Sequence, residues 1–182
     1  LFNWLYARQN KGTFVLRIED TDRERSTDEY VHSIMEGMEW LRLSWDEGPF
    51  HQVDRMDLYK SYIEKLLSEG KAYKCFCTAE EIDVRKKAML AAGQKPKYDG
   101  LCRNANQNQA KPFCVRFVSK AEGTTIVRDL IKGDVSFENA EMDDLVIQRT
   151  DGTPTYNFCV VIDDALMRIT HIIRGDDHLN NT

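Results

Sequence analysis

Three cysteines and one tyrosine stand at a spacing that could hold a metal ion. One residue separates Cys75 from Cys77, Cys102 follows 25 residues after Cys77, and Tyr98 comes four residues before Cys102. Structural zinc takes four ligands, mostly Cys and His, often at C-x2–4-C spacing. The C-x-C pair is tighter than that, so three ordinary thiols are the alternative. In a zinc site the fourth ligand would be Tyr98, a carboxylate or water, because the nearby Asn104 offers only a neutral amide.

The two remaining cysteines, Cys114 and Cys159, lie inside the apolar runs PFCVRFV and YNFCVVI. A buried free cysteine behaves as a small hydrophobic side chain, so we expect both in the core. Five cysteines, an odd number, argue against a disulfide framework and favour the reducing cytoplasm.

A second chemical group follows the β-branched, apolar run Thr13–Ile18, which is typical of a buried strand. Glu19 and Asp20 leave that strand at its carboxyl end, where parallel α/β sheets bind ligands, and Asp22 and Arg25 follow. A carboxylate there can hold an ammonium group, and an arginine can hold a carboxylate or phosphate with two hydrogen bonds. The alternative is a loop whose acids and arginines pair with each other.

A third group lies where a predicted strand, ITHIIRG, meets a predicted helix start, DDHLNN. Arg174 ends the apolar run, so we expect it to be partly buried and to need an anion, from the protein or from a ligand. The acids that follow it would suit the first turn of a helix. His171 and His178 are isolated histidines, and neither is favoured as a catalytic base.

The elements that must position these groups follow an interrupted α/β pattern. Periodicity and caps predict four helices: LFNWLYARQN ended by Gly12, a helix opened by the capping box Ser26-x-x-Glu29, a helix from Met56 to Gly70, and a basic helix from the capping box Thr78-x-x-Glu81 to Gly93. In the second helix an apolar stripe is expected to face the core: Val31, Ile34, Met35, Met38 and Leu41. AYKCFC reads as a strand, and YNFCVVIDD as a buried helix or strand. Strand-like runs at short spacing predict an antiparallel region: PFCVRFV, TTIVRDL, GDVSF and DLVIQRT.

Composition and charge limit the class of protein. With 182 residues, 42% hydrophobic and 30% charged, the chain fits one or two globular domains, and no apolar run approaches the ~18 residues of a membrane helix. Residues 1–70 carry 9 Lys and Arg against 14 Asp and Glu, residues 71–120 carry 11 against 4, and residues 121–182 carry 5 against 12. The basic middle could meet a polyanion or could simply be solvated. The net charge of −5 argues against a general nucleic-acid coat protein.

Taken together, several strings resemble bacterial-type glutamyl-tRNA synthetases, in order and with matching spacing over the whole chain: FVLRIEDTDRERS, WDEGPF, AYKCFC, KYDGLCR, RTDGTPTYNFCVVIDD and ITHIIRGDDHLNNT. The resemblance implies an α/β fold, the Rossmann-like catalytic domain of a class I synthetase, split by an inserted mixed α+β domain that grips the tRNA acceptor end. Residues 1–70 would be the first half of the catalytic domain without its first strand, 71–155 the insert, and 156–182 the start of the second half.

The resemblance also implies roles for individual residues. Glu19 matches the position that holds the α-ammonium group of glutamate. Tyr156 and Arg174 match positions that close over the amino acid, with Arg174 pairing with its side-chain carboxylate.

Two further pairs match positions near the other substrates. Asp177 and His178 would lie near the ATP ribose, and Asp22 and Arg25 near the terminal adenosine of the tRNA. No residue is expected to act as a catalytic acid, base or nucleophile, because adenylate formation depends on positioning and charge stabilisation.

Zinc-bearing relatives take their fourth ligand either two residues after the distal cysteine, where this chain has Asn104, or four residues before it, where it has Tyr98. The resemblance therefore implies a structural zinc on Cys75, Cys77, Tyr98 and Cys102. Relatives without zinc keep the three free thiols as the alternative.

As a whole, the resemblance implies a monomeric, cytoplasmic, ATP- and Mg-dependent ligase that joins L-glutamate to tRNA(Glu). The HIGH-type and KMSKS-type signatures of such ligases are absent from the sequence, so we expect an inactive internal fragment of the catalytic core. Two alternatives stay open: a glutamyl-Q tRNA(Asp) synthetase, which shares the core, and a non-catalytic tRNA-binding module.

Overall fold

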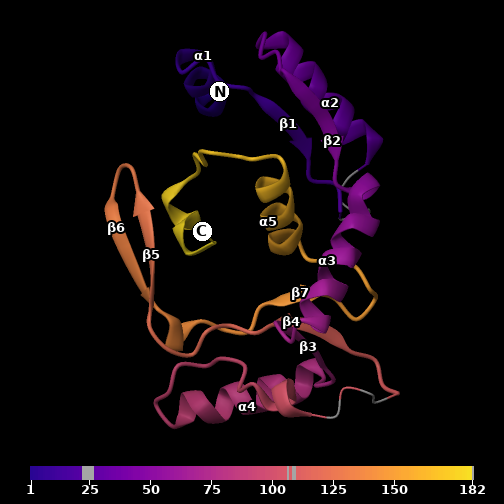
Figure 1. The fold of residues 1–182 in the computed structure, drawn as a ribbon, viewed down its shortest axis with the longest axis vertical. Helices are drawn as coiled ribbons and strands as arrows, with labels where there is room; N and C mark the ends of the chain where they lie inside the picture. Colours follow the sequence, from indigo (N-terminus) through magenta and orange to yellow (C-terminus); the bar gives the residue numbers. More distant parts are fainter. Residues whose placement is uncertain (22–26, 106, 108–109, 182) are drawn as a thin grey trace. The chain divides into compact units, whose positions relative to one another are not determined.

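The computed structural model describes residues 1–21, 27–105, 107 and 110–181, and it divides into two compact units (Figure 1). Unit 1 comprises Leu1–Lys60 and Tyr156–Thr182, and unit 2 comprises Ser61–Thr155. The chain passes from the first unit to the second within one helix, α3 (Met56–Ser68).

Unit 1 is built on two parallel strands. β1 (Val15–Ile18) pairs with β2 (Glu47–His51), with Ile18 opposite His51, and α2 (Asp28–Trp40) forms the crossover between them. Parallel strands need such a crossover, usually a helix. The pair confirms the α/β prediction and places the end of β1, followed by Glu19, at the carboxyl edge of the sheet.

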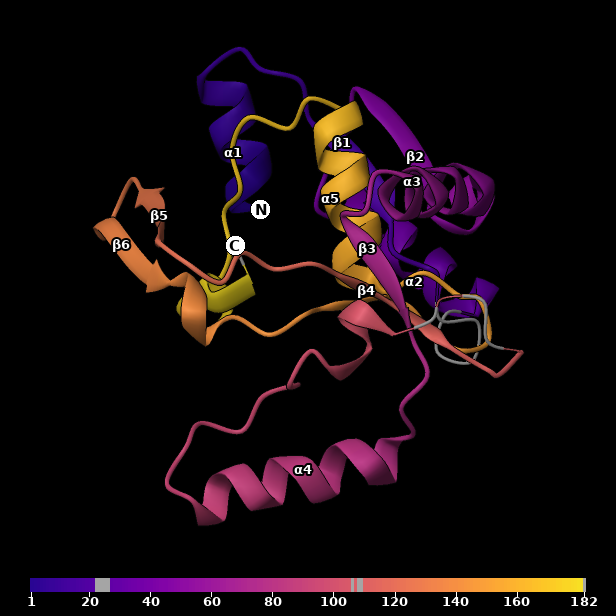
Figure 2. The ribbon, with the colours of Figure 1, turned by 60° about the horizontal axis from the view of Figure 1, so that its bottom comes forward.

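Three further elements complete unit 1. α1 (Phe2–Gln9) precedes β1, a 3-10 helix (Val53–Arg55) leads into α3, and α5 (Tyr156–Leu166) lies beside β1 (Figure 2). The sequence left α5 open between helix and strand, and it is a helix. The core of unit 1 contains buried side chains from β1, α3, α5 and the segment before β2: Ile18, Leu43, Tyr59, Phe158, Cys159 and Ile162. The burial of Cys159 confirms the expectation for that thiol.

The ends of α1 and α2 differ from their predicted caps. Lys11, with φ +52°, takes the left-handed conformation after α1, whereas the prediction gave the stop to Gly12. Gly12 still closes the helix end, because its N–H donates to the Ala7 carbonyl oxygen at 2.8 Å. α2 begins after Thr27, whose side chain makes no capping hydrogen bond, and Ser26 of the predicted capping box lies outside the described residues.

The apolar stripe of α2 is less buried than predicted. Ile34 is 50% exposed and Leu41 54% exposed, and none of the residues of α2 is buried. The prediction that this face packs into the core is therefore wrong for Ile34 and Leu41. A helical period shows that one face is apolar, but not that the same chain supplies a surface to cover it.

β2 is the strand that the sequence patterns did not predict. It contains Gly48-Pro49, a pair that is typical of turns. Gly48 allows the strand to form because its φ is +102° and because a Cβ atom there would lie 2.2 Å from the Leu16 carbonyl oxygen. The close approach of the two strands therefore requires glycine at this position.

Gly48→Ala is expected to lower the free energy of unfolding by about 2 kcal/mol, because the methyl group meets backbone and the residue keeps an unfavourable φ. Gly70→Ala is the matched control, since Gly70 also has a positive φ, +67°, but no atom within 4 Å of the new Cβ. Urea denaturation followed by circular dichroism measures both. Equal losses in the two variants would refute the contact with Leu16.

The predicted strand ITHIIRG is wrong. Residues 169–175 have no regular secondary structure, and Ile172 and Ile173 are 53% and 40% exposed. A strand exists only with a hydrogen-bonded neighbour, and among the described residues β1 and β2 pair only with each other. The predicted helix start that follows is a 3-10 helix, Asp176–Asn181.

Unit 2 contains two antiparallel sheets. β3 (Ala72–Cys75), β4 (Cys114–Phe117) and β7 (Val146–Gln148) form one, in the order β3-β4-β7. β5 (Thr124–Asp129) and β6 (Gly133–Glu138) form the other as a hairpin (Figure 1). All five runs were predicted as strands, and the antiparallel arrangement is confirmed.

The helix of unit 2, α4 (Ala79–Ala91), begins with the predicted capping box. The Glu81 N–H donates to the Thr78 hydroxyl oxygen at 3.2 Å, and the Thr78 N–H donates to the Glu81 carboxylate at 2.9 Å. Cys114 on β4 is only partly buried, so the core prediction holds for Cys159 and not fully for Cys114. The longest helices in the described ranges have 13 residues, and none is long and apolar enough to cross a membrane.

Candidate functional site

Glu19 lies at the carboxyl end of β1 within an ion network. Arg17 donates from Nη2 to Glu19 Oε1 at 3.2 Å and from Nη1 to Asp164 Oδ1 at 2.7 Å. The Glu19 side chain is 37% exposed and that of Arg17 only 15%. Glu19 thus presents a carboxylate that a solute can reach, held on its inner side by an arginine.

Tyr156 opens α5 and faces the same charges. Burial raises the pKa of its phenol, and the charge and hydrogen bond of Glu19 raise it further, while the nearby positive charges of Arg174 and Arg17 lower it. The charges of Glu19 and Arg174, which were predicted to bind glutamate, thus both act on Tyr156, the third residue predicted to bind it.

Arg174 differs from its prediction in burial. It is exposed, and its Nη1 donates to the His178 carbonyl oxygen at 3.5 Å, a long contact. The expectation that it would be partly buried fails because residues 169–175 form no strand. An exposed guanidinium is still available to a ligand carboxylate.

Of the other residues predicted to bind substrates, the structure describes Asp177 and His178. His178 Nε2 lies 3.5 Å from Asp177 Oδ2, and both side chains are exposed in the 3-10 helix after Arg174. Asp22 and Arg25 lie outside the described residues. Asp20 is buried and accepts a hydrogen bond from the Val53 N–H at 2.9 Å, so this acid serves the protein itself.

The sequence patterns missed Asp163, the most connected buried acid of unit 1. Its side chain is fully buried, and it accepts hydrogen bonds from Gln52 Nε2 at 3.0 Å, Arg55 Nε at 2.8 Å and Tyr59 Oη at 2.8 Å. Arg17 Nε lies 3.8 Å away. Asp163 therefore joins α5 to β1 and to the segment that follows β2.

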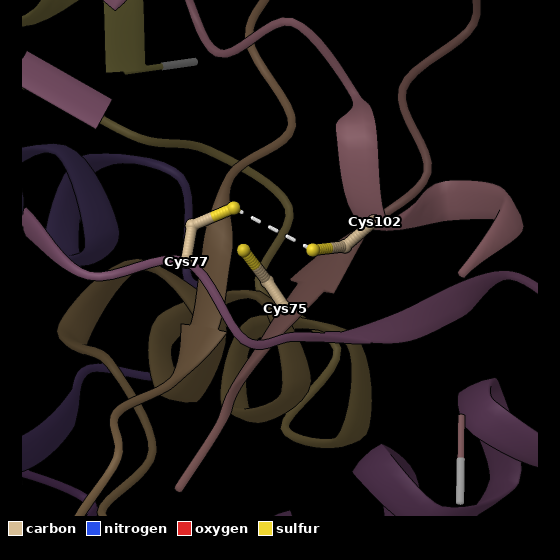
Figure 3. A group of neighbouring side chains, drawn as sticks. All are labelled: Cys75, Cys77 and Cys102. Atoms are coloured by element: carbon tan, nitrogen blue, oxygen red, sulfur yellow. Dashed lines mark hydrogen bonds between the residues drawn. The ribbon is translucent and has the colours of Figure 1, made fainter. Parts of the chain in front are cut away.

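In unit 2 the three cysteines of the predicted metal site converge (Figure 3). The sulfur atoms of Cys75, Cys77 and Cys102 lie within 4.8 Å of one another, and those of Cys77 and Cys102 are 3.5 Å apart. Cys75 ends β3, and Cys102 lies in the 3-10 helix Leu101–Asn104. Both thiols are almost fully buried.

Tyr98 points its hydroxyl group at the same cluster. Its oxygen lies 3.3 Å from Cys75 Sγ and 3.6 Å from Cys77 Sγ, and it accepts a hydrogen bond from the Cys102 N–H at 3.0 Å. The structure therefore brings together all four residues that the spacing singled out, and among the described residues Asn104 makes no hydrogen bond with the thiols.

The donor set fits zinc. A tetrahedron with Zn–S bonds of ~2.3 Å has sulfur atoms about 3.8 Å apart, close to the separations here. Two neighbours favour thiolates, which are the ligand form. A hydrogen bond from Cys114 lowers the pKa of Cys75, whereas burial raises the pKa of Cys77 even though Arg85 Nη2 donates to its Sγ at 3.1 Å. Cys75, Cys77, Cys102 and Tyr98 would hold the ion.

The basic charges of α4 are paired within unit 2. Arg85 Nε lies 3.0 Å from Asp99, Lys87 Nζ 2.7 Å from Asp83, and Lys86 Nζ 3.7 Å from Asp143. The Lys87 side chain is 74% exposed and that of Lys86 38% exposed, so their pairs are weak. The positive excess of residues 71–120 is thus partly compensated by acids of the same unit.

These features fit a synthetase catalytic domain, and comparison with known proteins agrees. The model of one family, described as tRNA synthetases class I (E and Q), catalytic domain, matches residues 1–182. The chain belongs to this family, as the resemblance indicated, and its fold is that of a class I synthetase catalytic domain.

Two similar members of the family are glutamate–tRNA ligases. The chain is 63% identical to the glutamate–tRNA ligase of Trichlorobacter lovleyi and 64% identical to that of Citrifermentans bemidjiense, over its whole length in both cases. It spans 39% of the length of each of these relatives.

Solved structures give the same picture. A glutamate tRNA ligase from Elizabethkingia meningosepticum, in complex with its amino acid, matches 98% of the chain with a TM-score of 0.84 and 32% identity, over 40% of its own length. The glutamate-tRNA synthetase of Elizabethkingia anophelis matches all of the chain with a TM-score of 0.85 and 32% identity, over 41% of its own length.

Proposed function

We propose that the chain forms part of a glutamate–tRNA ligase. This enzyme activates L-glutamate with ATP, whose phosphates carry Mg²⁺, and transfers the amino acid to the 3′ end of tRNA(Glu). The main support is the presence of an accessible carboxylate at the end of β1, Glu19, and of an exposed guanidinium on the segment after α5, Arg174. An α-amino acid with an acidic side chain carries the charges that would complement them. The high identity to glutamate–tRNA ligases over the whole chain is consistent with this.

In this proposal Glu19 binds the α-ammonium group, Arg174 binds the side-chain carboxylate, and Tyr156 packs over the amino acid. The exposure of Glu19 and Arg174 suits groups whose counter-charge is a ligand. No side chain of this chain transfers a proton in the reaction. The residues hold the two reactants in place and balance their charge.

The remaining substrate roles follow the same logic. Asp177 and His178 lie just after Arg174, and we assign them to the ATP ribose. Asp22 and Arg25 are assigned to the terminal adenosine of the tRNA.

The organisation into domains is part of the proposal. Residues 1–70 and 156–182 would belong to the catalytic domain, and residues 71–155 would form an insert that holds the tRNA acceptor end. The separation of residues 61–155 as a compact unit supports an insert. A zinc ion on Cys75, Cys77, Tyr98 and Cys102 would fix the start of that insert to its 3-10 helix. We expect the enzyme to be a cytoplasmic monomer.

Glutamate-dependent exchange between ATP and pyrophosphate tests the function on the whole protein, with and without tRNA. Exchange that requires tRNA(Glu) is the expected result for a glutamyl-tRNA synthetase. Exchange without tRNA would instead indicate a glutamyl-Q tRNA(Asp) synthetase. Binding of tRNA with no exchange under either condition would indicate a non-catalytic tRNA-binding module.

Arg174→Ala in the whole protein is expected to raise the KM for glutamate roughly 10- to 150-fold, the equivalent of a hydrogen-bonded charge contact of about 1.5–3 kcal/mol. The KM for ATP should stay within about twofold. Arg168→Ala, which removes an exposed arginine from the same segment, is the control. Equal changes in both KM values would count against the assigned role.

A further inference from the structure

We propose that Arg17 is a positioning residue for the amino acid: it fixes the Glu19 carboxylate so that Glu19 can receive the α-ammonium group, and Asp164 fixes Arg17. This inference rests on the proposed function and deepens it. It concerns residues to which neither the motifs nor the resemblance gave a role, and it explains how one acid at a strand end keeps a defined orientation.

The geometry of Arg17 is that of a fork between two carboxylates. One terminal nitrogen donates to Asp164 Oδ1 at 2.7 Å, and the other donates to Glu19 Oε1 at 3.2 Å. A planar guanidinium held at both terminal nitrogens cannot turn without losing a contact. Arg17 and Glu19 are two residues apart at the end of β1, so their side chains share one face of the strand.

Asp164, which accepts from one terminal nitrogen of Arg17, is held in place by its neighbour in the core of unit 1. Asp164 follows Asp163, whose fully buried carboxylate is held by donors from three residues. α5 is thereby fixed where Asp164 meets Arg17. The first residue of the same helix, Tyr156, lies close enough to Glu19 for that carboxylate to raise the pKa of its phenol, after burial. α5 thus acts on the orientation of Glu19 from its second half, through Asp164 and Arg17.

The two distances also explain why Glu19 keeps its attraction for a cation. Asp164 makes the shorter contact with Arg17, so the positive charge of Arg17 is matched chiefly by Asp164. Glu19 uses one oxygen for its longer contact and remains 37% exposed. An incoming ammonium group therefore meets a carboxylate that is oriented without being neutralised.

The experiment compares Arg17→Ala and Arg17→Lys with the unmodified whole protein in pyrophosphate exchange. The two probes are L-glutamate, measured by its KM, and glutarate, measured by its inhibition constant. Glutarate has the same two carboxylates but no α-amino group. Arg8→Ala is the matched control, since Arg8 belongs to unit 1 and makes a 2.7 Å ion pair with Asp46.

Arg17→Ala is expected to raise the KM for glutamate by about 10- to 100-fold, as for a misplaced binding group. The KM for ATP and the inhibition constant of glutarate should change by less than about threefold. Arg17→Lys should give a smaller loss, because the ammonium group keeps the positive charge. Some loss should remain, because one ammonium group cannot span both carboxylates. Arg8→Ala should leave all three constants unchanged.

Two results would overturn the proposal. An unchanged KM for glutamate in Arg17→Ala would remove the role, and equal weakening of glutamate and glutarate would show that Arg17 only supports the fold. If Arg17→Ala does not fold by circular dichroism, the same comparison on Arg17→Lys and Asp164→Asn decides. If the unmodified protein shows no glutamate-dependent exchange, the proposed function fails first, and this inference fails with it.

Discussion

Asp163→Ala is expected to lower the free energy of unfolding by about 3–5 kcal/mol, the cost of removing one partner from a buried charge network. The substitution leaves Arg55 without its carboxylate and the fully buried Gln52 and Tyr59 without an acceptor. Each unsatisfied buried polar group costs ~1–3 kcal/mol. The cavity left by the carboxylate is small, so the loss comes chiefly from hydrogen bonds and charge.

The chain offers a local probe for this measurement. Its three tryptophans, Trp4, Trp40 and Trp45, all belong to unit 1, so their fluorescence in urea reports on the unit that contains Asp163. Asp163→Asn should give an intermediate loss, because the amide keeps one acceptor oxygen. Asp57→Ala should have little effect, since that side chain is fully exposed and lies 3.9 Å from Lys60. A loss below about 1 kcal/mol in Asp163→Ala would contradict the network.

The sequence held a signal for Asp163 that the pattern analysis did not use. In a helix over YNFCVVIDD, Asp163 lies four residues after Cys159 and one after Ile162, on the buried side. An acid on the apolar face of a helix must find donors. Once that run is taken as a helix, a buried partnered carboxylate follows, but its partners lie more than 100 residues away in sequence and could not be named.

The strands were predictable where pairing is local. β5 and β6 form a hairpin within residues 124–138, so their own alternation and turn suffice. The predictions for β2 and for residues 169–175 were wrong for the same reason. β2 is a strand that was not predicted, and residues 169–175 were predicted as a strand but form none. The pattern of β2 reads as a turn, yet β1 is available to pair with it, whereas ITHIIRG has strand composition but no partner among the described residues. A strand is a property of a pair.

The residues of the candidate site were likewise only partly predictable from the sequence. Glu19, Arg174 and the cysteines were proposed because their residue types, at predicted strand ends or at metal-ligand spacing, indicate chemistry. Arg17 belongs to the same string as Glu19 but was given no role, since one arginine within a strand gives no sign of which carboxylates it will join. Spacing also could not decide between Tyr98, a carboxylate and water as the fourth ligand. The fold favours Tyr98 for the proposed site, because the Tyr98 N–H donates to Asp143 at 3.1 Å and its hydroxyl oxygen lies 3.3 Å from Cys75 Sγ.

Cys102→Ser is expected to weaken zinc binding on the order of 100-fold or more. Structural zinc contributes ~10–16 kcal/mol through four ligands, or about 3 kcal/mol for each. Since binding energy at such a site is folding energy, the variant should also unfold unit 2 at lower urea concentration. Metal analysis and competition with a chromogenic chelator measure the affinity. Cys159→Ala, which removes a thiol of unit 1, should leave the zinc content unchanged.

Tyr98→Phe separates the fourth ligand from the three thiols. It removes the oxygen that lies 3.3 Å from Cys75 Sγ but keeps the ring on which the Arg116 guanidinium stacks at 4.0 Å. We expect weaker zinc binding than in the unmodified chain and a changed absorption spectrum when cobalt replaces zinc, because the oxygen donor is lost. Unchanged affinity and spectrum would show that water or a carboxylate completes the site. If the unmodified chain binds no zinc at all, the three cysteines and Tyr98 form a buried hydrogen-bonded cluster, and the metal assignment is wrong.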